Sequence, residues 1–249
     1  MILAGEIHIM NIILALTILL TVYVINRFLH SKYYIEQGYK MAEKTIAFSR
    51  DLLEPELKIL VVGDSTGLGV GASSPDTSVT GMVAKRFPKA TIHNRSINGA
   101  KAENVIRQLK RADDSYDLVM IHVSGNDVVK MTAFKEYEEN IQTVLALAKT
   151  KGKYIVLIPT GNLGTIRIFP LPVRWLLEYR TKKIRVVSMK AVALAGERVR
   201  YVDFFVEKNK DPFYLDPEQH FAMDHFHPSD TGYAQWIPGI NQALDYFKL

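Results

Sequence analysis

Three residues in this sequence have the types and spacing needed for nucleophilic catalysis, namely Ser65, Asp224 and His227. Ser65 ends the segment LKILVVGDS, so we expect it on the first turn after a buried strand, where a sharp turn exposes a serine hydroxyl. Asp224 and His227 lie three residues apart in DHFHPSD, and one loop can bring both to a single site. A histidine there can accept the serine proton while the carboxylate orients the ring and stabilises the imidazolium. The pattern predicts acyl transfer through an acyl-enzyme.

Acyl transfer also needs hydrogen-bond donors directed at the tetrahedral oxyanion, and two further residues could supply them. Gly99 in SINGA follows the second apolar run of the domain, where a residue without a side chain lets its backbone N–H approach a ligand. Asn126 in SGND follows the third apolar run and carries a side-chain NH2 group. With the N–H of Ser65 they predict a three-donor oxyanion hole. Losing one such donor costs roughly 3 to 4 kcal/mol of transition-state stabilisation.

These residues must be held by a sheet, and short apolar runs alternate with longer periodic segments along the chain. The expected strands lie at 57–62, 91–94, 118–123, 154–159 and 200–204. The expected helices lie at 102–111, 133–150, 172–194 and 230–247. This alternation predicts an α/β fold, a three-layer α/β/α sandwich with a five-stranded parallel sheet. Ligands bind such folds at the carboxyl ends of the strands, where this chain has the clusters GDST, NRSINGA, SGND and PTGN.

The polar clusters resemble, in the same order, the conserved blocks of the SGNH hydrolase (GDSL-type esterase/lipase) superfamily. Ser65, Gly99, Asn126 and His227 match its four signature letters, and Asp224 matches the acid of its DxxHP block. The resemblance extends over residues 57–247. It implies a flavodoxin-like fold and a serine esterase that uses neither a metal nor a cofactor.

One block departs from the family pattern. The third block is usually Gly-x-Asn-Asp, whereas this chain has Ser124-Gly125-Asn126-Asp127. Asn126 is kept and the glycine is shifted. The catalytic roles stay intact, but the shape of this loop, and of the acyl pocket beside it, is left open.

Two other interpretations of the first block fit less well. GDSTG also satisfies the G-x-S-x-G elbow of α/β-hydrolases, but an elbow serine should follow several strands, and its acid and histidine usually lie on separate loops. Gly67, Gly69 and Ala72 match G-x-G-x-x-A, with Arg95 near a position for a 2′-phosphate. A dinucleotide-binding turn should begin at the strand end, however, and this interpretation leaves DxxHP unexplained.

The histidines allow a metal site as a further alternative. His220, Asp224, His225 and His227 are clustered and could hold zinc, but their spacing fits no standard motif. A metal on His227 would also leave Ser65 without a base. His122, inside the third apolar run, is expected to be a hydrogen-bonded core residue.

The N-terminal segment predicts a membrane anchor at residues 1–30. Residues 9–25 carry no charge, and as a helix their 17 residues would be roughly 25 Å long, a short but sufficient span. A buried core helix and a cleaved signal peptide are the alternatives, but a signal should have a basic start and a small-residue cleavage site. Residues 31–55 are expected to form an amphipathic linker helix ending at Pro55, followed by the catalytic domain at 56–249.

The charges beside this segment predict its orientation. No lysine or arginine precedes the span, whereas Arg27, Lys32, Lys40 and Lys44 follow it. The positive-inside rule therefore predicts a cytoplasmic catalytic domain, with a periplasmic or extracellular domain as the alternative.

Composition excludes several classes of protein. The chain has 249 residues, 48% of them hydrophobic and 23% charged, which indicates one globular domain behind the anchor. The formal charge of +5 is spread along the chain without a dense basic stripe, so nucleic-acid binding is not indicated. The absence of cysteine excludes disulfides, thiolate catalysis and cysteine zinc sites.

The expected function is hydrolysis of carboxylic esters, acyl esters of lipids or lysophospholipids in particular, because the domain is tethered to a membrane. Segment 165–185 combines aromatic and basic residues and could lie on lipid. A helix with one face in the core and a solvated basic face is the commoner arrangement. One alternative is removal or transfer of O-acetyl groups on a carbohydrate by the same residues. Another is a catalytically silent, membrane-anchored binding module. The sequence does not indicate the oligomeric state.

Overall fold

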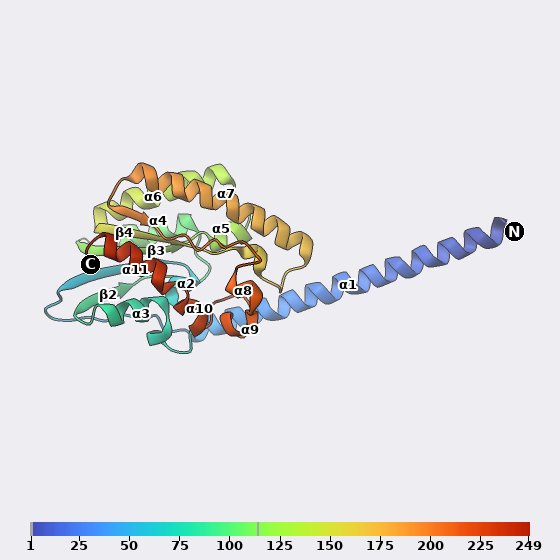
Figure 1. The fold of residues 1–249 in the computed structure, drawn as a ribbon, viewed down its shortest axis with the longest axis horizontal. Helices are drawn as coiled ribbons and strands as arrows, with labels where there is room; N and C mark the ends of the chain where they lie inside the picture. The colour runs from blue at the N-terminus through green and yellow to red at the C-terminus, as the bar shows by residue number, and fades with distance from the viewer. Residues whose placement is uncertain (1, 114) are drawn as a thin grey trace.

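A five-stranded parallel sheet lies at the centre of the catalytic domain (Figure 1). The computed structural model describes residues 2–113 and 115–249. The strands run in the order β2-β1-β3-β4-β5, and every adjacent pair is parallel. Their bounds are β1 Leu57–Gly63, β2 Ala90–Asn94, β3 Tyr116–Val123, β4 Gly152–Pro159 and β5 Val199–Tyr201. The predicted α/β fold with a five-stranded parallel sheet is confirmed.

Helices cover both faces of this sheet (Figure 1). The longer ones are α3 Val79–Arg86, α4 Ala102–Arg111, α6 Phe134–Lys151, α7 Leu171–Ala195 and α11 Ile237–Tyr246. Short helices in the connections are α2 Ser65–Leu68, η1 Pro75–Thr77, α5 Gly125–Val129, η2 Leu163–Thr165, α8 Pro212–Leu215, α9 Pro217–His220 and α10 Asp230–Ala234. The predicted range of α4 is the observed one, and α6 and α7 differ from prediction by one residue at each end.

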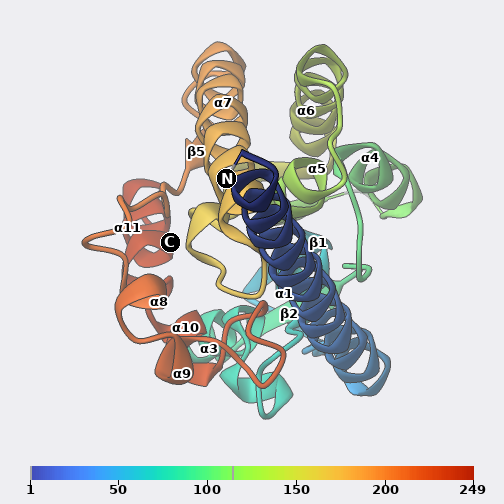
Figure 2. The ribbon, with the colours of Figure 1, turned by 90° about the vertical axis from the view of Figure 1, so that its right-hand side faces the viewer.

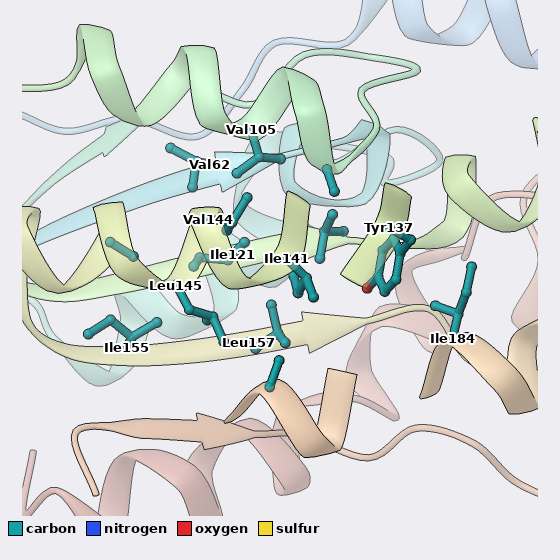
Figure 3. Packing of buried hydrophobic residues seen from close by; sticks show 14 of the residues in the cluster. Val62, Val105, Ile121, Tyr137, Ile141, Val144, Leu145, Ile155, Leu157 and Ile184 are labelled. Carbon is teal, nitrogen blue, oxygen red and sulfur yellow. The ribbon is translucent and has the colours of Figure 1, made fainter. Parts of the chain in front are cut away.

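Helices α4, α6 and α7 pack on one face of the sheet (Figures 1 and 2). Figure 3 shows this layer, in which Ile121 and Leu157 of the strands meet Ile141 and Leu145 of α6. These side chains are at most 2% exposed. Burying a large aliphatic side chain contributes roughly 1.5 to 3 kcal/mol, so this layer is a main source of stability.

The other face of the sheet is covered by α3 and α11. Here Met120 and Val156 pack under Tyr233 and Leu244, all fully buried. The single helix predicted at 230–247 is wrong, since α10 ends at Ala234 and α11 begins at Ile237. Pro238 explains the break, because proline lacks an N–H and is tolerated only in the first turn of a helix.

Strand β5 is shorter than predicted and ends at Tyr201. The apolar residues after Tyr201, which the prediction had included in the strand, pack in the core. Val202 is buried in the core on the α3 and α11 side of the sheet, and the Phe204 ring stacks on Trp236 with centroids 4.8 Å apart. The apolar run at 200–204 therefore extends beyond the last residue of β5, which is why the strand was predicted too long.

One helix, α1 Ile2–Lys44, contains both the predicted anchor and most of the predicted linker (Figure 1). From Met10 it is apolar and long enough to cross a membrane, and its apolar stretch is exposed, as expected of an anchor or a signal sequence. The linker helix predicted at residues 31–55 ends earlier, because α1 ends at Lys44. The chain then becomes extended, and Arg50 forms an antiparallel bridge with Ile92 on the open edge of β2.

The part of α1 beyond Asn26 packs on the domain along one stripe. Its partly or fully buried residues recur every three or four positions: Arg27, His30, Ser31, Tyr34, Gln37, Gly38, Met41 and Ala42. Arg27 Nη2 donates to the carbonyl of Arg167 at 2.8 Å, and Ser31 Oγ donates to that of Ile168 at 2.6 Å. Helix α1 is thus fixed to the domain over its last turns.

The contact between α6 and α7 can be tested through a buried hydroxyl pair. The Tyr137 hydroxyl and Ser188 Oγ are 2.7 Å apart, and both residues are fully buried. We expect Tyr137→Phe and Ser188→Ala each to lower the free energy of unfolding by about 1 to 3 kcal/mol, because each leaves its partner unpaired. The double variant should lose less than the sum. Denaturant unfolding of the four proteins measures this coupling, and additive losses would contradict it.

Candidate active site

The turn after β1 presents Ser65. Gly63, the last residue of β1, is held by the buried Gln108 side chain, which accepts from its N–H at 2.7 Å and donates to its carbonyl at 2.9 Å. Asp64 caps α2 by accepting from the N–H of Thr66 at 2.9 Å and from its hydroxyl at 2.7 Å. Ser65 is therefore the first residue of a short helix at the carboxyl edge of the sheet, and it is 5% exposed.

Ser65, His227 and Asp224 form a continuous hydrogen-bonded row. Ser65 Oγ lies 2.9 Å from His227 Nε2, and His227 Nδ1 lies 2.5 Å from Asp224 Oδ2. Because a carboxylate can only accept, Nδ1 carries the ring proton and Nε2 is free to accept from the serine. The structure thus brings together two segments 162 positions apart in sequence, as the sequence predicted.

The loop of Asp224 and His227 is closed by its own hydrogen bonds. Asp224 Oδ1 accepts from the N–H groups of Phe226 at 3.1 Å and His227 at 3.0 Å. The ends of the loop are joined by the N–H of Ala222, which donates to the His227 carbonyl at 2.8 Å. Asp224 therefore fixes the loop with one oxygen and the imidazole with the other.

Asp224 is fully buried, and its surroundings favour the charged form. Burial is the largest influence and by itself raises the pKa of the Asp224 carboxyl. The hydrogen bond and charge of His227, with the N–H groups of His227 and Phe226, together outweigh it and hold the pKa below its usual range. The site thus contains a carboxylate that stays ionised next to the imidazole.

Gly99 and Asn126 lie on the loops that follow β2 and β3, on either side of the turn of Ser65 in the sheet order. Gly99 has φ of 75°, a conformation that favours glycine. Asn126 is half-buried in the first turn of α5. The Ser65 N–H lies in the first turn of α2, where a helix leaves backbone donors without intrahelical partners.

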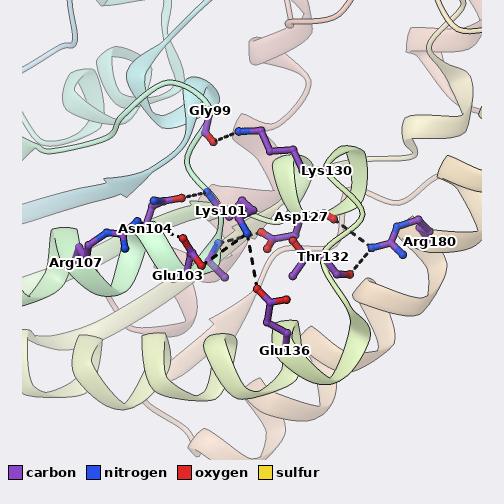
Figure 4. A network of polar contacts seen from close by, with 11 residues as sticks. Gly99, Lys101, Glu103, Asn104, Arg107, Asp127, Lys130, Thr132, Glu136 and Arg180 are labelled. Atoms are coloured by element: carbon purple, nitrogen blue, oxygen red, sulfur yellow. Dashed lines mark hydrogen bonds and ion pairs between the residues drawn. The ribbon is translucent and has the colours of Figure 1, made fainter.

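A polar network ties these two loops together (Figure 4). Lys130 Nζ donates to the Gly99 carbonyl at 2.7 Å, and Asp127 Oδ2 accepts from the N–H of Ala102 at 3.0 Å. Arg180 of α7 donates to the carbonyls of Val128, Asp127 and Thr132 and so fixes the end of α5. Burial, the largest influence, raises the pKa of Asp127 to about 6, and the Ala102 N–H opposes it.

The departure in the third block leaves the backbone turn in place. Ser124 has a positive φ of 91°, and it occupies the position where the family pattern has its first glycine. The next residue, Gly125, begins α5. Ser124 Oγ accepts from the Thr160 N–H at 3.1 Å. This bond joins the ends of β3 and β4 and offsets part of the backbone strain.

The other residues considered for a metal site or a phosphate site are not part of the row from Ser65 to Asp224. His122 is fully buried with Nδ1 3.2 Å from the Thr66 hydroxyl, and burial lowers its pKa to about 3, so it is neutral. His220 Nδ1 lies 2.8 Å from the Asp216 carbonyl, and the His225 ring packs on Tyr34 of α1. The Arg95 side chain pairs with Asp113 at 3.1 Å on the surface.

A small pocket lies at the carboxyl edge of the sheet. It has a volume of about 70 Å³ and is lined mainly by apolar side chains. Its walls include Thr66 and Pro228, which follow Ser65 and His227 in the chain. Its other walls include Leu163, Phe204, Phe213 and Trp236.

Sequence reasoning missed the residues that support this site from other elements. Gln108 is one of several polar residues of α4, Lys130 directly follows α5, and nothing in their local pattern distinguishes them from surface residues. Gly38 of α1 approaches Asp224 and His227. A glycine inside an otherwise good helical segment was the one available signal, because glycine is disfavoured there unless packing requires it.

Comparison with known proteins agrees with this fold. A GDSL-like esterase of Mycobacterium tuberculosis is 23% identical over 187 residues, which is 72% of this chain and 59% of that protein. The structure of TesA superposes with a TM-score of 0.58 at 18% identity, covering 75% of this chain and 97% of its own. A lipolytic protein of the G-D-S-L family from Veillonella parvula gives 0.57 at 16%, covering 74% and 96%.

The fold is therefore that of GDSL lipolytic proteins. Residues 61–235 match the model of the GDSL-like lipase/acylhydrolase family, and this chain belongs to that family of carboxylic ester hydrolases. The chain spans about three-fifths of the length of the mycobacterial relative. Helix α1 precedes the matched residues.

The strain at Ser124 can be measured with two variants. Ser124→Ala and Ser124→Gly both remove the hydroxyl that accepts from Thr160, but only alanine keeps the cost of a positive φ. We expect Ser124→Gly to be more stable by about 1 to 2 kcal/mol, after allowing for the greater chain entropy of glycine. Denaturant unfolding of both proteins measures the difference. Equal stabilities would show that the backbone at this position is unstrained.

Proposed function

We propose that this chain is a serine hydrolase of carboxylic esters, with Ser65 as nucleophile, His227 as general base and Asp224 as the acid that orients the base. The hydrogen-bonded row from Ser65 Oγ through His227 to Asp224, at 2.9 and 2.5 Å, is the observation that carries the proposal. Family membership supports the same reaction. Retention of all these residues argues against a catalytically silent binding module.

The geometry supports a two-step reaction. His227 Nε2 takes the Ser65 proton while Oγ bonds to the ester carbon, and the imidazolium is stabilised by the charge of Asp224. The same proton then goes to the departing alkoxide as the carbon–oxygen bond breaks, which leaves an acyl-enzyme. Water attacks this intermediate by the same proton transfers and releases the acid and Ser65.

The oxyanion is proposed to be bound by the N–H groups of Ser65 and Gly99 and by the side-chain amide of Asn126. Support comes from their positions after β1, β2 and β3, which are neighbours in the sheet. The Lys130 and Asp127 bonds keep the two outer loops at fixed positions. Donors fixed in advance are worth more than mobile ones, because no reorganisation is needed during the reaction.

A fluorophosphonate probe tests the nucleophile. Wild type should be labelled at Ser65 and should hydrolyse p-nitrophenyl esters, and Ser65→Ala should lose labelling and about a millionfold in kcat. Asp224→Asn should lose about 10⁴-fold, because the amide leaves the ring in the wrong tautomer. Mass spectrometry of the labelled peptide measures the first result and steady-state kinetics the second. Absence of labelling in folded wild type would refute the serine mechanism.

A membrane-resident acyl ester is the proposed substrate class, and the proposed anchor is its first support. Arg27 of α1 is bonded to the carbonyls of Arg167 and Ile168, just before α7, so the end of the apolar span lies next to the start of α7 (Figures 1 and 2). In that start Leu171, Trp175 and Leu176 are 48, 65 and 46% exposed. Exposed apolar residues beside a span suit contact with lipid.

Hydrolysis or transfer of acetyl groups on a carbohydrate is the second candidate, favoured by one observation. The pocket that includes Thr66, the residue after Ser65, has about 70 Å³, which suits a short acyl group better than a whole fatty chain. Its mainly apolar lining fits the acyl side of either ester. On the lipid hypothesis only the first carbons of the chain would be enclosed.

Two substrates of different form separate these candidates. We expect Trp175→Ser/Leu176→Ser to lower hydrolysis of long-chain lysophospholipid in anionic vesicles about tenfold, because surface binding depends on buried apolar area. Hydrolysis of soluble p-nitrophenyl acetate should not change. Val186→Ser/Met189→Ser, at exposed positions farther along α7, is the matched control. Activity confined to acetyl esters across a chain-length series would contradict the lipid hypothesis.

A further inference from the structure

Helix α1 reaches the acid–base pair through Gly38. Among the residues of α1 whose side-chain positions are described, Gly38 alone is buried. A Cβ atom placed on it would lie 2.8 Å from Asp224 Oδ2 and 3.6 Å from His227 Cε1. Oδ2 is the oxygen that binds His227 Nδ1. The helix backbone therefore lies directly against the Asp224–His227 hydrogen bond.

The loop of His227 is also contacted from a second side, at His227 Cβ and at the backbone of Pro228. A Cβ on Gly71, in the loop after α2, would lie 3.1 Å from His227 Cβ and 2.3 Å from the Pro228 carbonyl. Gly38 and Gly71 thus contact the Asp224–His227 loop at different atoms. Both contacts are backbone contacts, so the enclosure is closer than side chains would permit.

Contacts on either side of Gly38 hold the helix in this place. One turn earlier, the Tyr34 ring packs edge-on against His225 with centroids 4.7 Å apart. Arg27 and Ser31 bond to the carbonyls of residues 167 and 168. These bonds connect α1 to the segment before α7 and to the loop of the base.

The family match begins at residue 61, so this wall comes from a segment outside the matched domain. A sheet and loops like those of the family account for Ser65, Asp224 and His227. They do not supply the contact that Gly38 makes with the fully buried Asp224. The helix that carries the apolar span is the segment that adds it.

We infer that Gly38 is a positioning residue and that α1 is part of the catalytic unit, as the wall that holds Asp224 on His227 and keeps water from the carboxylate. The inference rests on the proposed function. A carboxylate shielded from water acts more strongly on a neighbouring charge, so the wall increases stabilisation of the imidazolium that forms during catalysis. Any side chain at position 38 must displace Oδ2 or lift the helix.

The test is Gly38→Ala in the full chain in detergent micelles. We expect kcat for p-nitrophenyl butyrate to fall about 10- to 100-fold, as displaced catalytic groups do, with KM nearly unchanged. The low-field proton resonance of the Asp224–His227 hydrogen bond should shift or broaden. Helix propensity favours alanine, so general weakening of α1 is not the expected cause of the loss. Lys40→Ala, exposed two residues later, should behave as wild type.

A second pair of variants keeps the inference testable if Gly38→Ala does not fold. Tyr34→Ala should lower kcat by loosening α1 from the His225 loop, whereas Tyr39→Ala, at a position 60% exposed, should not. Wild-type kcat in a folded Gly38→Ala protein, or equal kcat in the two tyrosine variants, would overturn the inference. An inactive and unlabelled wild type would instead refute the proposed function itself.

Discussion

A fully buried carboxylate keeps its charge only when the groups around it replace the lost water, and the site is arranged around this requirement at Asp224. Two N–H groups of its own loop satisfy one oxygen, and the His227 ring satisfies the other. The same bonds set the loop shape, the ring tautomer and the direction of Nε2 toward Ser65. Removing the charge would therefore disturb the geometry and the electrostatics at once.

The sheet order explains why the other groups converge on this row. Strand β1 lies between β2 and β3, and a ligand crevice forms at the carboxyl ends where the connections leave in opposite directions. The loops after β2 and β3 flank the turn of Ser65, and Lys130 joins them. Arg180 connects this network to α7, so the layer of helices with a packed core also fixes loops at the edge (Figure 4).

Much of this could be predicted from sequence, and the failures have physical causes. Strands β1 to β4 are buried on both faces and read as apolar runs, and the polar clusters after them mark the carboxyl edge. The run at 200–204 misled because its apolar residues continue past the last residue of β5. Val202 still donates to the Leu157 carbonyl of β4 at 3.0 Å, and Phe204 is partly buried against Trp236. Gln108 and Gly38 were missed because their partners are 45 and 186 positions away, and no local pattern records such contacts.

Helix α1 runs from the apolar stretch to Gly38 without a break, so the proposed anchor is rigidly connected to the catalytic domain. Gly38 lies eleven positions after Arg27, so about 16 Å of continuous helix lies between the end of the span and the acid–base pair. A flexible link would let the catalytic domain move through a wide volume, whereas the proposed anchor would hold the active site at a fixed height above the membrane. Esters lying deeper in the bilayer or farther out in solution would have to come to that height to be cleaved.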